Sequence, residues 1–371
     1  FFGGEDANSF AKNFVSTLRS KGFLVANVNA HDAKKQRGNV QASTDRIDLV
    51  GIATMLLNCR ANCSPAQSGI YRNLRTLVRH RRRLVQMLTE VKNRVHGIVD
   101  ELFPGFLNEK NSGIVPFTQS SLYLMEDRFS PKQIHRRRRH KLIEILKRLG
   151  TSKAEKTAVK LQQFAGKVLH SPVEYVDTLQ LSLAQHVKHI RCLKQSVAQM
   201  EKEIALNLAQ TQGAFLTSVR GIGLVLAAGV TAEIGDPNQQ KPLNNLVSYA
   251  GIIPRVKQTG GLDGKTYTGP VAKRCNRILK DYVVKSAYHL GLHGPQELMA
   301  DYKRRDASGQ HADFGIGRRY LRMAIRLMRT SQVYLSPNLR RNDCTLQQRA
   351  EYYLMSWPYL RDKWKKVGVL E

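Results

Sequence analysis

Hydrophobic residues recur with helical spacing along most of this chain, but residues 1–60 alternate helices with short strands. Phe1-Phe2 is predicted to be the end of a strand, and Phe23–Val28 is predicted to be a short buried strand. Apolar side chains recur every four residues between them, at Phe10, Phe14 and Leu18. This spacing predicts a helix that Gly22 closes. A strand–helix–strand unit belongs to a sheet, of which this region supplies only part.

A second helix of this α/β region opens after Ser43-Thr44, residue types that favour the amino-terminal cap of a helix. Its inner face is predicted to contain four apolar residues: Leu49, Ile52, Ala53 and Leu56. We expect the α/β region to span residues 1–66.

Residues 67–212 are predicted to be almost wholly helical. A first helix ends near Phe103-Pro104-Gly105, and the run Arg136–Arg139, between His135 and His140, starts another. The first helix has an arginine-rich face: Arg72, Arg75, Arg79, Arg81, Arg82 and Arg83. Arginine runs on helices usually form solvated faces. Clustering, few balancing acids and the interleaved His and Tyr71 favour contact with nucleic acid instead.

After Pro172, apolar residues keep three- and four-residue spacing over a single helix of about 40 residues, about 60 Å long. They are Val176, Leu179, Leu183, Val187, Ile190, Val197, Met200, Ile204 and Leu208. The pattern is that of a coiled coil. Two interpretations stay open, a hairpin arm within the chain and an interface between copies of the chain.

Residues 213–332 are predicted to form a compact, glycine-rich helical domain, and residues 333–371 a basic tail. The chain of 371 residues has 59 Lys and Arg against 29 Asp and Glu, a net charge of +30 and a pI near 10.2. Such an excess favours a polyanionic partner, with nucleic acid first and an anionic membrane surface second. The sequence contains no run of about 18 apolar residues, so a membrane anchor is not predicted. Five scattered cysteines favour free thiols in the cytoplasm over a zinc site.

Three acidic residues are candidates for metal binding. Asp45 and Asp48 lie three apart at the start of a predicted helix, so their carboxylates project from one face. Glu5 follows a predicted strand end, where open α/β sheets place functional groups. Three oxygen ligands suit Mg²⁺, which activates phosphodiesters and water. The alternative is ordinary stabilisation of a helix amino terminus by acidic side chains.

Two glycine-containing segments are candidates for phosphate binding. Arg220-Gly221-Ile222-Gly223 precedes an apolar helix, whose amino-terminal N–H groups suit a backbone phosphate. Thr259-Gly260-Gly261 forms a predicted turn between basic residues: Arg255, Lys257, Lys273, Arg274 and Arg277. Glycines allow a phosphate to approach the backbone, and the basic residues neutralise it. For both segments the alternative is a simple turn between two helices.

The order Tyr249–Arg255, then Thr259–Gly261, then Ala272–Lys280 resembles the IS110/IS116 family of bacterial insertion-sequence transposases. In that family the segments read roughly Tyr-Ala-Gly-Leu-x-Pro, then Ser-Gly-Gly, then Ser-Lys-Arg-Gly-Asn-x-x-Leu-Arg. The resemblance implies that residue 259 is the nucleophile that joins a DNA end. Here it is threonine in place of serine, and Cys275 stands where the family has glycine. The Gly221/Gly223 segment is similar to the family's helix-hairpin-helix element.

The acidic residues also match the family, whose RuvC-like domain has a DEDD metal site. Glu5–Phe10 stands for Glu-x-Thr-Gly-x-Tyr, Val28–Ala30 for Val-Asn-Pro, and Ser43–Leu49 for the Thr-Asp-x-x-Asp element. The resemblance therefore implies Mg²⁺ ligands at Glu5, Asp45 and Asp48. It places the first aspartate ahead of Phe1, so we expect an amino-terminal truncation.

The resemblance implies an α+β, mostly helical fold with a partial RuvC-like domain, a long helical arm and a helical transposase domain. It implies a DNA transposase or recombinase that cleaves and rejoins strands with Mg²⁺ and a hydroxyl nucleophile. Its partners would be DNA, a structured noncoding RNA and other copies of the chain, in the cytoplasm at the nucleoid. The alternative is a nucleic-acid-binding relic without catalysis, and a structural coiled coil would leave the glycine-rich turn unexplained.

Overall fold

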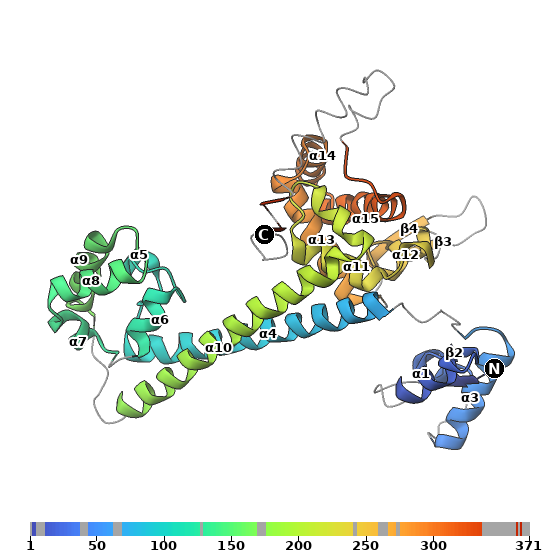
Figure 1. Ribbon diagram of the computed structural model, residues 1–371, viewed down its shortest axis with the longest axis horizontal. Coiled ribbons are helices and arrows are strands. Elements are labelled where there is room, and N and C mark those ends of the chain that lie inside the picture. The colour runs from blue at the N-terminus through green and yellow to red at the C-terminus, as the bar shows by residue number, and fades with distance from the viewer. Residues whose placement is uncertain are drawn as a thin grey trace. The chain divides into compact units, whose positions relative to one another are not determined.

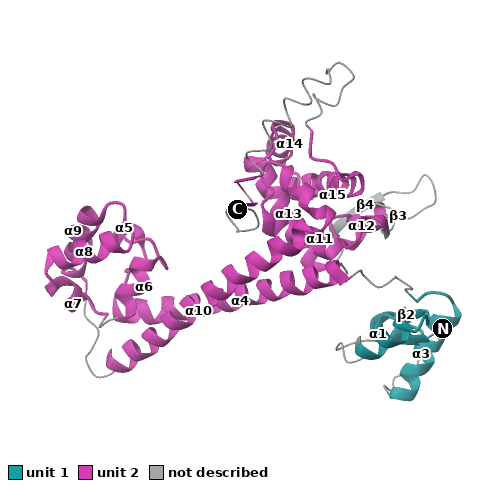
Figure 2. Cartoon of the chain, viewed as in Figure 1, with its two compact units in different colours: residues 1–68 teal, residues 69–371 magenta. Residues whose placement is uncertain are grey.

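A computed structural model describes most of the chain as two compact units, residues 1–68 and 69–371 (Figure 2). The described residues are 2–4, 12–37, 44–61, 69–126, 129–168, 176–239, 243–258, 266–271, 275–335, 361–362 and 364–365. Helices predominate in both units, which confirms the mostly helical α+β class. The two units are described separately.

The first unit contains the predicted strand–helix–strand element. Its strands pair in parallel, with Phe2 opposite Val25 and Gly4 opposite Asn27. Its elements are β1 (Phe2–Gly4), α1 (Lys12–Ser20), β2 (Val25–Asn27), α2 (Ala30–Lys35) and α3 (Asp45–Leu57). Gly22, at φ +84°, follows the end of α1, and the Thr44 side chain caps α3 by accepting a hydrogen bond from the Ile47 N–H. Both predicted helix boundaries are confirmed.

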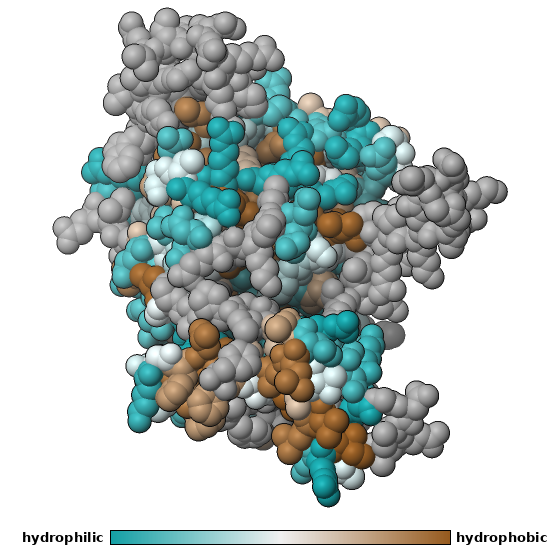
Figure 3. Space-filling view, turned by 90° about the vertical axis from the view of Figure 1, so that its right-hand side faces the viewer, coloured by the Kyte–Doolittle hydropathy of each residue, from teal (hydrophilic) through white to brown (hydrophobic). Residues whose placement is uncertain are grey.

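The core of the first unit is small, and its predicted inner faces are partly wrong. Val28, Ala33 and Met55 form its buried cluster. Gly51 is buried against the Ala33 carbonyl, and this close approach turns Met55 inward and leaves Leu49 and Ala53 exposed. Phe14 is 63% exposed because the described two-stranded sheet is too small to cover it. Exposed hydrophobic residues also form patches on the surface in Figure 3.

The second unit is organised around two helices of 34 residues each, α4 (Gly69–Leu102) and α10 (Val176–Ala209). They pack against each other in opposite directions, as Figure 1 shows. The apolar stripe of α10 is buried in the unit at Leu183, Val187 and Ile190. The stripe is therefore covered within the chain, as the hairpin interpretation predicts.

At one end of this hairpin lies a cluster of short helices with its own core. They are α5 (Glu109–Ser112), α6 (Gln119–Glu126), α7 (Pro131–Arg136), α8 (Arg139–Arg148) and α9 (Ala154–Ala165). Phe103, Phe106 and Phe129 pack together there with ring centroids 4.8–5.5 Å apart. Val99 and Leu183 join this core from α4 and α10.

At the other end of the hairpin, a larger core includes Leu74 of α4 and Leu208 of α10. The elements there are the 3-10 helices η2 (Gln212–Ser218) and η3 (Pro237–Gln239) and the helices α11 (Leu224–Ile234), α12 (Leu243–Tyr249), α13 (Arg277–His293), α14 (Gln296–Ala307) and α15 (Ala312–Thr330). Tyr320, on α15, is one of the largest fully buried side chains of this core. The second unit thus has two cores, one at each end of the α4–α10 hairpin.

One prediction for this domain is wrong, because it is not entirely helical. β3 (Pro254–Gln258) and β4 (Thr266–Val271) form an antiparallel hairpin with an irregularity between Pro254 and Val256. Alternating residues such as Val256 and Lys257 favour a strand, and the glycines between the strands favour their connection. The glycine-rich segment therefore connects two strands and not two helices.

Candidate functional site

The β3–β4 hairpin contains the candidate nucleophile in its connecting segment. The register pairs Gln258 with Thr266, and residues 259–265 connect them. Thr259, Gly260 and Gly261 lie outside the described residues, as do Lys273 and Arg274 and the side chains of Arg255 and Lys257. The described part of the site is therefore the base of the hairpin.

Asn276 joins the two ends of this base. It caps α13, and its side-chain oxygen accepts hydrogen bonds from the N–H groups of Ile278 and Leu279, both at 3.1 Å. Its backbone N–H donates to the carbonyl of Tyr249, the last residue of α12, at 2.8 Å. Its Nδ2 donates to the Tyr249 hydroxyl, also at 2.8 Å. The residues before and after the hairpin are thus held together by the backbone and side chain of one residue.

The same Nδ2 group donates to Glu233, a fully buried carboxylate on α11, at 2.8 Å. Arg79 donates to both Glu233 oxygens, at 2.8 and 3.0 Å, and Arg75 donates to Oε2 at 2.8 Å. Burial alone would raise the pKa of Glu233, but the Arg79, Arg75 and Asn276 groups lower it to about 2. Glu233 is therefore an anion at neutral pH, and it joins α4, α11 and α13.

Neither Glu233 nor Asn276 was predicted from sequence as a site residue. Glu233 is the single charged residue of α11, whose other residues are apolar or small except for Thr231. Arg75 and Arg79 lie one turn apart on α4, so they approach Glu233 from one side. The sequence signal that could have identified this cluster is a lone acidic residue on an apolar helix together with two arginines four residues apart on another helix.

The Gly221/Gly223 segment has the predicted turn geometry. Gly221 has φ +90°, and a Cβ there would lie 3.0 Å from the His289 carbonyl, so the turn requires glycine. Gly223 precedes α11 and provides no side-chain cap for it. Arg220 is exposed beside this turn. Binding of phosphate by these residues stays a prediction.

The predicted metal ligands are only partly described. Asp45 and Asp48 lie in the first turn of α3, where Asp45 is exposed and Asp48 pairs with Arg37. Glu5 lies outside the described residues. Among those that are described, no group of three His, Cys, Asp or Glu side chains gathers as a metal site would require. Two carboxylates in one turn fit the oxygen chemistry of Mg²⁺. The ion would compete with Arg37 for Asp48.

The run Arg136–Arg139 does not start one helix but spans the junction of two. Arg136 ends α7, and Arg139 begins α8 after the extended residues Arg137 and Arg138. The run bends here because the Gln162 side chain donates to the Arg137 carbonyl at 2.6 Å and accepts from Arg139 at 3.1 Å. Beside it, His135, Arg139, Gln162 and Gln163 line a cavity of about 350 Å³. Arg136 and Arg138 are exposed.

The sequence predicted few acids to balance the arginine-rich face of α4, and this prediction is wrong for most of its arginines. Arg75 and Arg79 pair with Glu233, Arg81 with Glu201 at 2.5 Å, and Arg82 with Asp281 at 2.5 Å. Acids distant in sequence therefore balance four of the six arginines. Arg277, in contrast, is exposed in the first turn of α13.

Comparisons with known proteins identify the class of protein to which this site belongs. A family model described as "Transposase", of the DEDD type of IS110, matches residues 2–104. A second, described as "Transposase IS116/IS110/IS902 family", matches residues 213–303. Together the two models cover more than half of the chain, and both describe transposases. The first spans the first unit and α4, and the second lies within the second unit.

The chain belongs to the IS116/IS110/IS902 family of transposases. It is similar to the insertion element IS110 uncharacterized 43.6 kDa protein of Streptomyces coelicolor, with 26% identity over 176 residues. The similar region is 46% of this chain and 42% of that protein. No described helix is both long enough and apolar enough to cross a membrane.

Proposed function

We propose that this protein is a DNA transposase or recombinase that cleaves and rejoins DNA strands through the hydroxyl group of Thr259. The supporting observation is the anchored base of the β3–β4 hairpin, where Asn276 binds both Tyr249 and the buried Glu233. A reacting group is effective only when its support is rigid, and a buried, fully paired carboxylate provides such a support.

The proposed step conserves atoms and charge. The Thr259 oxygen attacks a backbone phosphorus, an O–P bond forms, and one P–O bond to a deoxyribose breaks. A neighbouring base takes the proton of the threonine hydroxyl, and the leaving deoxyribose oxygen takes up a proton. The hydroxyl end of a second strand then gives its proton to the base and attacks the same phosphorus. The bond between phosphorus and the Thr259 oxygen breaks, and this oxygen takes up a proton. The energy of the phosphodiester is retained in the covalent intermediate, so rejoining needs no separate energy source such as a nucleoside triphosphate.

The proposal assigns the acidic residues to a RuvC-like domain in the first unit. Glu5, Asp45 and Asp48 would hold Mg²⁺, which when bound polarises the phosphodiester and stabilises developing charge. Asp48 forms an ion pair with Arg37, which holds this carboxylate in place. Asp263 or this acidic cluster would accept the proton of Thr259.

The partners follow from the distribution of exposed positive charge. Arg220 and the amino terminus of α11 would bind the DNA backbone. The exposed Arg136 and Arg138 would bind a structured noncoding RNA or DNA at the other end of the α4–α10 hairpin. Oligomerisation remains part of the proposal. Leu183 and Ile190 of the α10 stripe are buried within the chain, so an interface between copies would use other residues.

The test is a covalent protein–DNA adduct formed with element-end DNA, Mg²⁺ and the noncoding RNA. Thr259→Ser should keep or raise the adduct yield, because serine lacks the β-methyl group that restricts χ1. Thr259→Ala should abolish it. An adduct in Thr259→Ala would assign the nucleophile to another residue. DNA binding without any adduct in the unchanged protein would support the inactive relic.

A further inference from the structure

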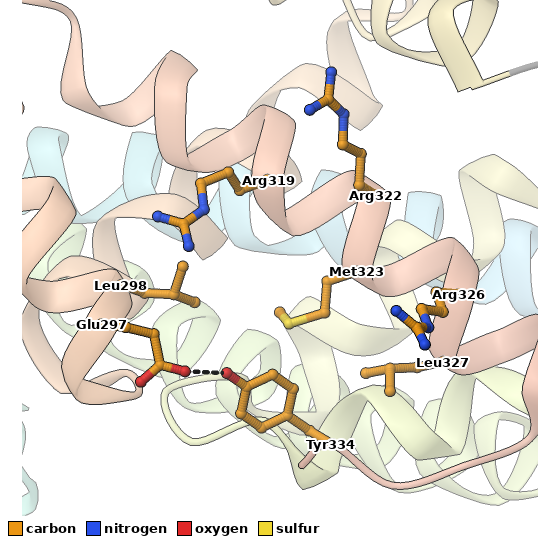
Figure 4. A pocket seen from close by; sticks show the side chains of 8 residues that line it. All are labelled: Glu297, Leu298, Arg319, Arg322, Met323, Arg326, Leu327 and Tyr334. Carbon is orange, nitrogen blue, oxygen red and sulfur yellow. Dashed lines mark hydrogen bonds between the residues drawn. The ribbon is translucent and has the colours of Figure 1, made fainter. Parts of the chain in front are cut away.

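A cavity of about 240 Å³ lies between α14, α15 and the segment that follows α15 (Figure 4). Arg319, Arg322 and Arg326 line it from α15 at three- and four-residue spacing, so they share one face of this helix. Met323 lies between these arginines on the same face. The cavity therefore combines three guanidinium groups and one carboxylate, that of Glu297, with an apolar surface.

The wall opposite α15 is held in place by hydrogen bonds. The Tyr334 backbone N–H donates to the Ser218 hydroxyl at 2.8 Å, and the Tyr334 hydroxyl donates to the Glu297 carboxylate at 2.7 Å. Tyr334 is only 6% exposed. Leu298 adjoins Glu297 and adds a second apolar group to the lining. This side of the cavity is thus formed before any ligand binds.

The positive charge of the cavity is not fully balanced. Arg319 pairs with the buried Asp301 at 2.5 Å, and Asp301 also binds Arg304 and Arg305. Arg322 and Arg326 are exposed, and no ion pair joins either of them to another part of the described chain. They lie one helical turn apart, where like charges repel. An anion between them would relieve this repulsion.

We propose that this cavity binds one unpaired nucleotide of a single strand. Its phosphates would lie at Arg322 and Arg326, and its base would pack against Met323 and Leu298. Single-strand sites combine a basic track with surfaces on which a base packs, and the cavity has both. The inference rests on the proposed function, because that function makes nucleic acid the partner. It adds a contact that does not involve Thr259.

The first test measures binding of short single-stranded oligonucleotides by fluorescence anisotropy, without divalent metal so that no strand is cleaved. The variant Arg322→Ala/Arg326→Ala should weaken binding at least tenfold. It should also make the dependence of log affinity on log salt less steep by about 1.4. Each phosphate of a single strand that is no longer neutralised contributes about 0.7, and two are lost. The control Lys303→Ala/Arg318→Ala removes the same charge from α14 and α15 outside the cavity. It should leave most of the affinity.

The second test asks whether the base enters the cavity. One abasic position is moved along the oligonucleotide, and affinity should fall by about fivefold or more at one position, as expected for loss of a stacked base. Met323→Ala should remove most of that difference. DNA and RNA oligonucleotides are compared, and the tighter-bound one identifies the source of the nucleotide. If Arg322→Ala/Arg326→Ala unfolds, the Gln/Gln variant takes its place.

The outcomes separate this inference from the proposed function. If the unchanged protein binds single strands and the cavity variant binds them equally well, the inference is wrong and the proposed function stands. Affinity that is insensitive to every abasic position also contradicts it, as does binding of duplex alone. If the protein binds no DNA or RNA, both the inference and the proposed function fail.

Discussion

The two arginine clusters of this chain have similar sequences but different surroundings. On α4, Arg75 and Arg79 bind the fully buried Glu233. At the α7–α8 junction, Arg136 and Arg138 are exposed to solvent. Arg79 makes two hydrogen bonds to Glu233 that hold the base of the β3–β4 hairpin together with Asn276. The first cluster therefore stabilises the fold, and the second is available for a partner.

The difference shows that local charge density does not determine what an arginine binds. The acids that neutralise α4 lie far away in sequence, since Glu233 is 158 residues from Arg75 and 154 from Arg79. A buried carboxylate must be paired, whereas exposed ion pairs contribute little. The experiments below separate the two clusters, beginning with the largest expected effect.

Glu233→Gln should destabilise the protein by about 3 kcal/mol, because it leaves two arginines without their shared buried anion. The measurement is the free energy of unfolding in urea. Glu203→Gln on α10 is the matched control, because Glu203 is exposed, and it should change this free energy by less than about 0.5 kcal/mol. Equal effects of the two substitutions would show that the Glu233 cluster does not hold the fold.

Acid should weaken the same cluster. The pKa of Glu233 falls from the usual 4.5 to about 2 on folding, so its ionised form stabilises the fold above about pH 4.5. This contribution, about 3 kcal/mol, should be lost as the pH falls through that interval toward 2. Urea unfolding at several pH values measures it. Glu233→Gln should show a shallower pH dependence, and an unchanged profile would contradict the assignment.

Arg136→Ala/Arg138→Ala should affect DNA binding and leave the stability of the fold nearly unchanged. Unfolding should change by less than about 0.5 kcal/mol, because both side chains are exposed. The salt dependence of duplex binding should become less steep by about 0.9 for each phosphate that the variant no longer neutralises. Arg79→Ala is the reciprocal variant, which should destabilise the fold. An unchanged salt slope in the Arg136/Arg138 variant would make this run a solvated face.

Local patterns predicted the parts of the fold that depend on neighbouring residues. The cap at Thr44, the end of α1 near Gly22, the strand–helix–strand unit and the long helix α10 were all expected from periodicity and capping. The inner face of α3 was not, because the buried Gly51 sets its rotation through contact with Ala33. Periodicity cannot show which face a partner helix covers.

In the candidate site, too, the features set by neighbouring residues were predicted and those set by distant residues were not. The turn at Gly221 followed from its glycines, whereas Thr259 and the glycines beside it stay a prediction from a short motif. The Asn276–Glu233 network was missed because it joins helices that are distant in the sequence. The β3–β4 hairpin was also missed, since glycine-rich segments connect helices as readily as strands.

The most direct test of the account is to locate the DNA on the protein after the covalent reaction. Cleavage by trypsin after Lys257 and Lys265 releases residues 258–265, in which Thr259 is the one hydroxyl-bearing residue. After nuclease digestion, mass spectrometry should find a phosphonucleotide on this peptide, and Thr259→Ala should remove it. A nucleotide on the neighbouring peptide that contains Thr266, or on the one that contains Ser248, would contradict the assignment of Thr259.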